Sequence, residues 1–374
     1  MSSHMNILIV KMSAIGDVIH TLPALNALRV HFPDAHIAWL VEEAASPLVE
    51  GHQALDRVLI SKRKSWVRSL LGPSGLDNIR EAYSFVKEIR DTRYDIVLDF
   101  QSLLKSGVLI GLVKGKRKIG YDKGMEHMEQ SYLFLNERVP PVNMDIHALS
   151  RGMMLLEFLG IQSPKILYDL PIGDRDRAMA DDFLVRHGLT GHRPLVLIHP
   201  VAKWETKLWG TRKFSILTDR LIEQYNARVI FTGSQEDRTI IQHMISMMKG
   251  EAVNLAGETT LKILAALYEK SDLLISTDTG PMHLAAAVGT PVVALFGPTA
   301  PWRTGPFGSG HQIIRAGLKC SPCFKRECTT KDCMEQISVE DVLDGVEKLV
   351  DVAEYPVPND QYPISNERNR ENIQ

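Results

Sequence analysis

Short apolar runs and longer periodic stretches alternate along the whole chain. Apolar runs bounded by turn formers are typical of buried strands, whereas apolar residues that recur every three or four positions are typical of amphipathic helices. The strand-like runs lie at residues 6–11, 36–41, 57–61, 94–99, 195–199, 228–232, 273–276 and 291–296. Strands separated by helices in this way predict an α/β fold with parallel sheets that carry helices on both faces.

The pattern starts again in the second half of the chain, which predicts two domains. A periodic helix over residues 145–160 is closed by Gly160, and the segment 161–166 that follows it contains Pro164 and is the predicted hinge. The predicted boundaries are residues 1–4 for the remnant of an expression tag, 5–165 for the N-terminal domain, 166–352 for the C-terminal domain and 353–374 for a polar, aperiodic tail.

Composition excludes several classes of protein. The 374 residues carry a net charge of −2, which argues against nucleic acid as a partner. The longest apolar stretch, residues 102–113, is interrupted by Lys105 and falls short of the roughly 18 residues that a membrane span needs. The start of the chain has no apolar signal region. We therefore expect a cytoplasmic protein without a membrane span.

The stretch 273–299 is the most informative part of the chain. It contains an apolar strand, the turn formers 277–280, a short helix that begins near Pro281 and a second strand, and Gly289 stands where a left-handed helix cap is usual. The start of such a helix presents unpaired N–H groups and a partial positive charge, so it can hold an anion such as a diphosphate. His283 lies one turn into this helix. The alternative is an ordinary strand–helix–strand unit with a core histidine.

Another strand-to-helix turn lies at the start of the chain. The strand 6–11 leads into a helix at Gly16, but the dinucleotide-binding pattern G-x-G-x-x-G is missing, which argues against an oxidoreductase. Asp17 stands at this turn instead. It either caps the helix or belongs to a ligand site, because open α/β sheets bind their ligands at the carboxyl ends of the strands.

Charged residues follow two strands of the second half. Lys203 and Lys207 lie in the loop after the first of these strands, where a lysine can reach a phosphate, although surface lysines are common. Glu236 and Asp237 follow the next strand, and they either bind the hydroxyl groups of a ribose or cap the helix that begins there. These positions are candidates for a nucleotide site, and the spacing alone does not choose between the alternatives.

Four stretches together resemble glycosyltransferase family 9, the bacterial lipopolysaccharide heptosyltransferases. They read KMSAIGDVIHTLPAL at 11–25, DFQSLLKS at 99–106, HPVAKWETKLW at 199–209 and STDTGPMHLAAAVGTPVVALFGPT at 276–299. The first stretch, together with WLVEEAA at 39–45, is most similar to the heptosyltransferase I branch. The resemblance implies a GT-B fold, in which two Rossmann-like domains with parallel sheets face each other across a cleft. It also implies an inverting transfer that needs no metal cofactor.

The resemblance assigns roles to single residues. Asp17 is the implied general base, which takes the proton of the acceptor hydroxyl as the new bond forms. The departing ADP would be met by protein donors in the second domain. The implied donor-binding residues are Lys207, Glu236 or Asp237 for the ribose, Asp278, the amides of Thr279 and Gly280, and His283.

On the acceptor side the resemblance points to Arg63, Lys64 and Lys105. These residues would meet the carboxylates and phosphates of Kdo-lipid A. Arg63 and Lys64 belong to a basic run at 62–68, and a second run lies at 114–118. Judged by charge alone, such runs are either solvated surfaces or a rim that meets an acidic partner or an anionic membrane surface.

The implied function is the transfer of L-glycero-D-manno-heptose from ADP-heptose to a Kdo residue of the lipopolysaccharide inner core. The enzyme would work in the cytoplasm, or in peripheral contact with the cytoplasmic face of the inner membrane. The alternatives are a heptosyltransferase II or III that acts on a later core position, a nucleotide-sugar epimerase with the same fold, and a relative that binds the donor without catalysis.

Four cysteines lie close together in the sequence, with the spacing C-x2-C-x4-C-x4-C. They are Cys320, Cys323, Cys328 and Cys333. Four thiols can hold a structural Zn²⁺, although this spacing is not a common zinc pattern. The alternatives are reduced thiols and a disulfide formed on purification. In each case we expect the cysteines to take no part in the chemistry, which requires no cofactor.

Overall fold

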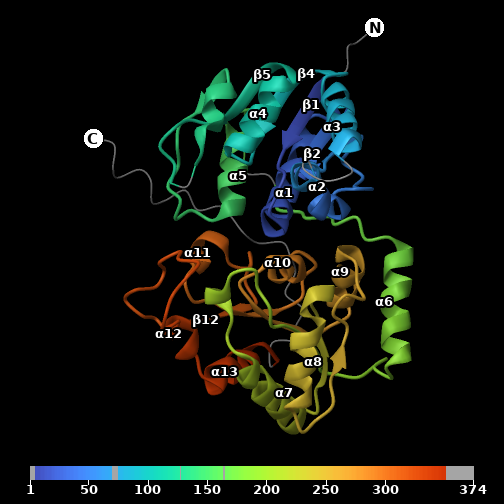
Figure 1. The fold of residues 1–374 in the computed structure, drawn as a ribbon, viewed down its shortest axis with the longest axis vertical. Helices are drawn as coiled ribbons and strands as arrows, with labels where there is room; N and C mark the ends of the chain where they lie inside the picture. Colours follow the sequence, from blue (N-terminus) through green and yellow to red (C-terminus); the bar gives the residue numbers. More distant parts are fainter. Residues whose placement is uncertain (1–4, 70–74, 127, 163–164, 351–374) are drawn as a thin grey trace. The chain divides into compact units, whose positions relative to one another are not determined.

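The computed structural model describes residues 5–69, 75–126, 128–162 and 165–350. The predicted tag remnant and the predicted tail therefore lie outside the described residues. By its internal contacts the chain divides into two units, one that ends at Pro171 and one that begins at Ile172 (Figure 1). Each unit is described by itself below.

The N-terminal unit contains a parallel sheet of six strands in the order β3-β2-β1-β4-β5-β6. The strands are β1 (Asn6–Val10), β2 (His36–Glu42), β3 (Arg57–Ser61), β4 (Arg93–Asp99), β5 (Lys114–Tyr121) and β6 (Glu137–Val139). The helices are α1 (Ile15–His31), α2 (Arg63–Ser69), α3 (Gly75–Ile89), α4 (Leu104–Leu112) and α5 (Ala148–Glu157), with short 3-10 helices η1 (Glu43–Leu48) and η2 (Gln130–Phe134).

The centre of this sheet is fully apolar. Residues 7–10 of β1 are completely buried, and Leu8 pairs with Ala38 of β2 and Val97 of β4. Phe85 of α3 and Ile110 of α4 pack into the same core cluster, whereas α1 packs against α5. Each such buried side chain contributes about 1.5–3 kcal/mol by leaving water, so β1 is held firmly in place. The rigid centre thus fixes the turn between β1 and α1.

The C-terminal unit contains a second parallel sheet of six strands, in the order β12-β11-β10-β7-β8-β9. The strands are β7 (Leu195–His199), β8 (Arg228–Phe231), β9 (Val253–Asn254), β10 (Leu273–Thr277), β11 (Val292–Leu295) and β12 (His311–Ile314). The helical elements are α6 (Asp174–Arg186), η3 (Glu205–Lys207), α7 (Thr211–Tyr225), η4 (Gln235–Asp237), α8 (Arg238–Ser246), α9 (Leu261–Glu269), α10 (Gly280–Ala287), α11 (Pro301–Thr304), α12 (Asp332–Glu335) and α13 (Val339–Val350).

Both sheets have the same topology. In each unit the first three strands run outward from the centre to one edge, and the next three start beside the first strand and run to the other edge. The strand order therefore reverses between β1 and β4 in one unit and between β7 and β10 in the other. Open α/β sheets bind ligands at this switch point, beside the carboxyl ends of the strands. The predicted α/β class with two Rossmann-like halves is confirmed.

Two stretches differ in detail from the simple pattern. The basic run at 114–118 forms the start of β5 and pairs with β4. A strand can hold this run because none of its residues is buried and successive side chains point to opposite faces of the sheet. The basic run at 62–68 lies mostly in α2. Within the ranges that the structure describes, no helix combines the length and the apolar character that crossing a membrane requires.

Candidate functional site

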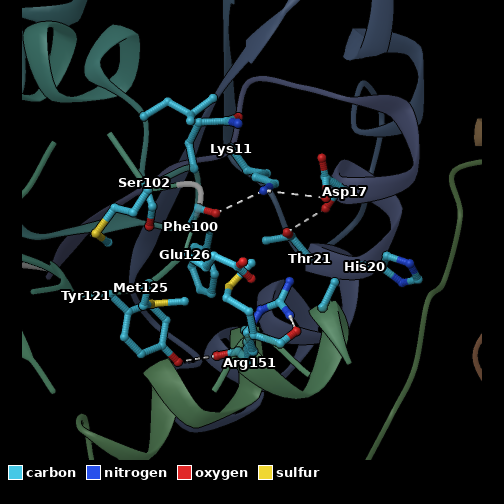
Figure 2. Close-up of a pocket in the computed structure, with 16 residues that line it drawn as sticks. Lys11, Asp17, His20, Thr21, Phe100, Ser102, Tyr121, Met125, Glu126 and Arg151 are labelled. Atoms are coloured by element: carbon cyan, nitrogen blue, oxygen red, sulfur yellow. Dashed lines mark hydrogen bonds and ion pairs between the residues drawn. The ribbon is translucent and has the colours of Figure 1, made fainter. Parts of the chain in front are cut away.

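A cavity of about 240 Å³ lies at the switch point of the N-terminal sheet (Figure 2). Its walls are the turn between β1 and α1, the segments that follow β4 and β5, and the first turns of α5. We call it the strand-end cavity. Figure 2 shows that Lys11, Asp17 and Arg151 reach it from different elements. Polar groups therefore meet at the place where the topology predicts a ligand.

Asp17 caps α1 and also faces the strand-end cavity. Its Oδ2 accepts a hydrogen bond of 2.9 Å from the backbone N–H of Ala14, which is the capping role that its position suggests. Its Oδ1 lies 4.0 Å from Lys11 Nζ, and 41% of the side chain remains exposed. The cap thus fixes the orientation of the carboxylate while one oxygen stays accessible to a hydroxyl group in the cavity.

Lys11 is a cation in the cavity wall. Its Nζ donates a hydrogen bond of 3.0 Å to the carbonyl oxygen of Phe100. Burial lowers the pKa of the Lys11 amino group, and the carboxylates of Asp17 and Asp99 act against this shift. Arg151 lines the same cavity and is near enough to lower the pKa of Lys11 as well. The cavity therefore offers the accessible carboxylate of Asp17 beside two cationic side chains, and the exposed Glu126 also lines it (Figure 2).

The segment after β4 holds the β1–α1 turn in place. Gln101 Oε1 accepts hydrogen bonds from the backbone N–H groups of Met12 and Ser13 at 2.8 and 3.0 Å. The buried Asp99 accepts in turn from the N–H groups of Gln101 and Ser102. Ser102 has a φ of 55°, which is uncommon for a residue other than glycine. Such conformations persist where the surroundings hold them, and functional sites are one such place.

The three basic residues that the resemblance assigns to the acceptor converge on one buried carboxylate. Glu42, the last residue of β2, has a side chain that is only 4% exposed. Lys64 and Lys105 lie 2.8 and 2.9 Å from it, and Arg63 lies at 3.5 Å. Lys105 also donates to Ser13 Oγ at 2.6 Å, which connects this basic cluster to the β1–α1 turn. Three cations on one carboxylate leave an excess of positive charge.

The charge of Glu42 is part of this arrangement. Burial raises the pKa of its carboxyl group, but the hydrogen bonds from Lys64 and Lys105 outweigh burial, and the pKa lies below its usual value. Glu42 is therefore ionised at neutral pH. It holds together residues from α2 and α4 that would otherwise repel one another.

In the C-terminal unit, Lys207 and Asp278 form a close ion pair at the switch point between β7 and β10. Lys207 Nζ lies 2.6 Å from Asp278 Oδ2 and 3.3 Å from the carbonyl oxygen of the same residue. Thr299 Oγ1 donates to the same carboxylate oxygen at 2.6 Å. The ammonium group also lies 4.6 Å from the centre of the Trp204 ring. We call this arrangement the Lys207–Asp278 site.

Helix α10 begins directly after this ion pair. Thr279 is the N-cap residue and Gly280 the first helical residue, with Pro281 in the first turn as predicted. His283 also lies in the first turn and is buried. The start of a helix carries about half a unit of positive charge and offers N–H donors, so the position of Lys207 beside it suits a phosphate group. The structure thus brings together all the donor-side candidates except the two acidic residues after β8.

Glu236 and Asp237 lie together in η4, and their side chains differ in role. Asp237 Oδ2 accepts hydrogen bonds from the N–H and Oγ of Ser234 at 2.8 and 2.6 Å, so Asp237 is the cap. Glu236 is exposed. The capping alternative therefore applies to Asp237, and Glu236 keeps its carboxylate accessible for a ligand.

The four cysteines are free thiols. Within the described parts of the chain, no group of three or more histidine, cysteine, aspartate or glutamate side chains is arranged to hold a metal ion. Hydrogen bonds from the backbone N–H groups of Lys331 and Thr330 lower the pKa of the Cys328 thiol. The structural zinc site stays a prediction.

Three residues of the two N-terminal clusters escaped the sequence analysis, namely Lys11, Glu42 and Arg151. Lys11 ends an apolar strand directly before a turn, and a lysine at the buried end of a strand was a usable signal. Glu42 has a glutamate neighbour in the sequence, and only the strand geometry tells which of the two is buried. Arg151 is one polar residue of an amphipathic helix, and nothing in its spacing distinguishes it.

Comparison with known proteins agrees with this architecture. The chain is 31% identical over 343 residues to lipopolysaccharide heptosyltransferase 1 of Pseudomonas aeruginosa, a match that covers 90% of this chain and 91% of that protein. It is 26% identical to the lipopolysaccharide core heptosyltransferase OpsX of Haemophilus influenzae, with coverage of 91% and 96%. The solved structure of Escherichia coli heptosyltransferase WaaC with ADP superimposes with a TM-score of 0.73 at 24% identity, over 92% of this chain and all of that one, which shows a shared fold.

The family assignment rests on a family model that covers more than half of the chain. The model of glycosyltransferase family 9 (heptosyltransferase) matches residues 82–334. This range contains the segment after β4 and the whole Lys207–Asp278 site. The match and the relative at 31% identity lead to the same conclusion. The chain belongs to glycosyltransferase family 9 and is an enzyme of the heptosyltransferase class.

Proposed function

We propose that this enzyme transfers L-glycero-D-manno-heptose from ADP-heptose to a Kdo residue of the lipopolysaccharide inner core. The observation that carries the proposal is the strand-end cavity, in which the accessible carboxylate of Asp17 lies beside the cations Lys11 and Arg151. A sugar acid such as Kdo needs a base for its hydroxyl group and a cation for its carboxylate, and one cavity offers both. The names of the relatives, which are lipopolysaccharide heptosyltransferases, support the same acceptor class.

The N-terminal unit would bind and activate the acceptor. The acceptor hydroxyl gives its proton to the Asp17 carboxylate while its oxygen bonds to the anomeric carbon of the heptose, and the bond from that carbon to ADP breaks with inversion. The hydrogen bond from the Ala14 N–H orients the Asp17 carboxylate for this step. Lys11 Nζ lies 4.0 Å from the other oxygen of this carboxylate. The basic cluster around Glu42 would bind the phosphates or further carboxylates of the acceptor lipid.

The C-terminal unit would bind ADP-heptose and stabilise ADP as it leaves. Lys207, the amides at the start of α10 and His283 would face the diphosphate, and the exposed Glu236 would take the ribose hydroxyls. Asp278 is engaged by Lys207 and Thr299, so we assign it to holding Lys207 in place rather than to the sugar itself. A donor with ADP is supported by the WaaC structure, which contains ADP.

A transfer assay by mass spectrometry tests the proposal. The protein is incubated with ADP-heptose and Kdo₂-lipid A, each substrate is omitted in turn, and release of ADP is followed in parallel. We expect a product that is heavier by one heptose, and ADP only when both substrates are present. Conversion of ADP-heptose into another ADP-sugar without an acceptor would instead support an epimerase, and ADP release without an acceptor would support a hydrolase. An untouched Kdo acceptor with a bound donor would support a heptosyltransferase II or III, and heptosylated cores would be the next substrate.

Asp17→Asn tests the role of the general base. Asparagine keeps an oxygen for the N–H of Ala14 but cannot take a proton, so turnover should fall by about 10²–10⁴-fold while ADP binding stays within about twofold. Asp176→Asn is the matched control, because Asp176 caps α6 from the same helical position and accepts from Gly173 N–H. Unchanged turnover in Asp17→Asn would remove Asp17 from the mechanism.

A further inference from the structure

The segment that carries the four cysteines packs onto the Lys207–Asp278 site. We call residues 318–333 the cysteine loop. On one side, Thr206 Oγ1 donates to the carbonyl oxygen of Lys325 at 2.9 Å, and Lys331 forms an ion pair of 2.8 Å with Glu205. On the other side, the N–H groups at 323 and 324 donate to the carbonyl oxygen of Pro298, which precedes Thr299. The loop is therefore attached to the segments before Lys207 and before Thr299.

This attachment places Arg326 on the same aromatic ring as Lys207. The Arg326 guanidinium lies 4.9 Å from the centre of the Trp204 ring, and the Lys207 ammonium lies 4.6 Å from the centre of the same ring. Arg326 is exposed, and it lines a cavity of about 360 Å³ whose wall also contains Thr206, Lys331 and the carboxylates of Glu205 and Glu327. Among the residues that the structure describes, no carboxylate pairs with Arg326, whereas the neighbouring Lys331 is paired with Glu205.

The charge balance of the Lys207–Asp278 site indicates a role for Arg326 in binding an anion. A diphosphate carries at least two negative charges. Lys207 and Asp278 neutralise each other at 2.6 Å, so the site as built offers an anion little more than the half charge at the start of α10. A transfer without a metal ion has to stabilise the departing diphosphate with protein groups alone. A second cation is needed close to Lys207, and a guanidinium supplies paired donors that match phosphate oxygens.

We propose that Arg326 is a diphosphate-binding residue of the donor site. The cysteine loop positions this residue, and its guanidinium packs on the Trp204 ring. The ligand class is a nucleoside diphosphate or its sugar ester. The inference rests on the proposed function, since it takes ADP-heptose as the donor. It also gives the cysteine loop a role in binding, because the fold of this loop determines where Arg326 stands.

Titration calorimetry with ADP and with AMP on the full chain tests the inference. Arg326→Ala should weaken ADP binding about tenfold, and AMP binding much less. Lys325→Ala is the matched control, because it removes a cation from the same loop without moving the backbone carbonyl that Thr206 contacts, and it should bind ADP within about twofold of the parent protein. Arg326→Lys should recover part of the lost affinity.

The outcomes separate this inference from the proposed function. Parent-like ADP binding by Arg326→Ala would overturn the role of Arg326 and leave the donor assignment intact. An equal loss for ADP and AMP would also overturn it, because the residue would then act on the fold of the site rather than on the second phosphate. If the parent protein itself does not bind ADP, the proposed donor fails and the role of Arg326 fails with it.

Discussion

Glu42 is the residue whose replacement tests the basic cluster most directly. Glu42→Gln keeps the size of the side chain and removes its charge. Lys105, which is only 19% exposed, then loses its counter-charge and keeps Ser13 Oγ as a partner. Lys64 and Arg63 are more exposed and can turn towards water. The main effect therefore falls on Lys105 and on the connection that it makes to the β1–α1 turn.

The expected size of the effect follows from burial. Removing one partner of a fully buried ion pair costs about 3–5 kcal/mol, and exposed pairs are worth about 0–1 kcal/mol. Lys105 lies between these limits and retains one hydrogen-bond acceptor, so we expect Glu42→Gln to lower the free energy of unfolding of the N-terminal unit by about 2 kcal/mol. For a unit of this size that corresponds to a fall in melting temperature of about 4–8 °C.

Thermal unfolding followed by circular dichroism measures the loss, and hydrogen exchange of the β2 peptide assigns it to the N-terminal unit. Glu43→Gln is the matched control, since Glu43 is the exposed neighbour, and it should change stability by less than about 0.5 kcal/mol. The pH dependence has a definite sign. The pKa of Glu42 is lowered in the folded state, so its contribution is complete above the unfolded pKa of about 4.3 and disappears as the pH falls through the folded pKa.

The free energies of unfolding of the parent protein and of Glu42→Gln should therefore differ at pH 7 and become equal in strong acid. A Glu42→Gln variant as stable as Glu43→Gln at pH 7 would refute the reasoning, because the carboxylate would then contribute nothing to holding the basic residues. A difference that persists unchanged at pH 2 would refute it as well, because the effect would then come from packing rather than charge.

Two further predictions concern the C-terminal unit. Lys207→Ala should weaken ADP binding by at least tenfold, since it removes the cation and leaves Asp278 to repel the diphosphate. Titration calorimetry measures this loss, with Lys203→Ala, a change at an exposed lysine, as the control. An unaltered ADP affinity would contradict the phosphate site. Metal analysis of protein purified without chelator tests the structural zinc site of the four cysteines. One zinc per chain would support the site, whereas no stoichiometric zinc together with four titratable thiols would exclude it.

Much of the fold follows from local patterns in the sequence. The strand 57–61 and the helix α7 lie where apolar runs and periodic spacing put them. Pro281 and Gly289 mark the start and the end of α10, and Gly289 has the positive φ of 87° that a left-handed cap requires. These features were predictable because each depends on residues that are neighbours in the chain.

The composition of the sites was predictable only in part. Asp17 and Lys207 stand at strand-to-helix turns, which are visible in the sequence. The partners of Glu42 lie in α2 and α4, tens of residues further along the chain. Arg326 reaches Trp204 across a still longer separation. No periodicity records such contacts, because they arise from the order of strands in the sheet and not from spacing along the chain.

The repeated strand order also bears on how such an enzyme changes over evolutionary time. Each half has its own switch point between its own pair of central strands, β1 with β4 and β7 with β10. On the proposed function, mutations in the loops at one switch point can therefore alter the recognition of one substrate while the site for the other is inherited unchanged. On the proposed function, in which the N-terminal unit binds the acceptor, a library confined to the loops after β1, β4 and β5 would vary the acceptor site and leave the nucleotide site unchanged.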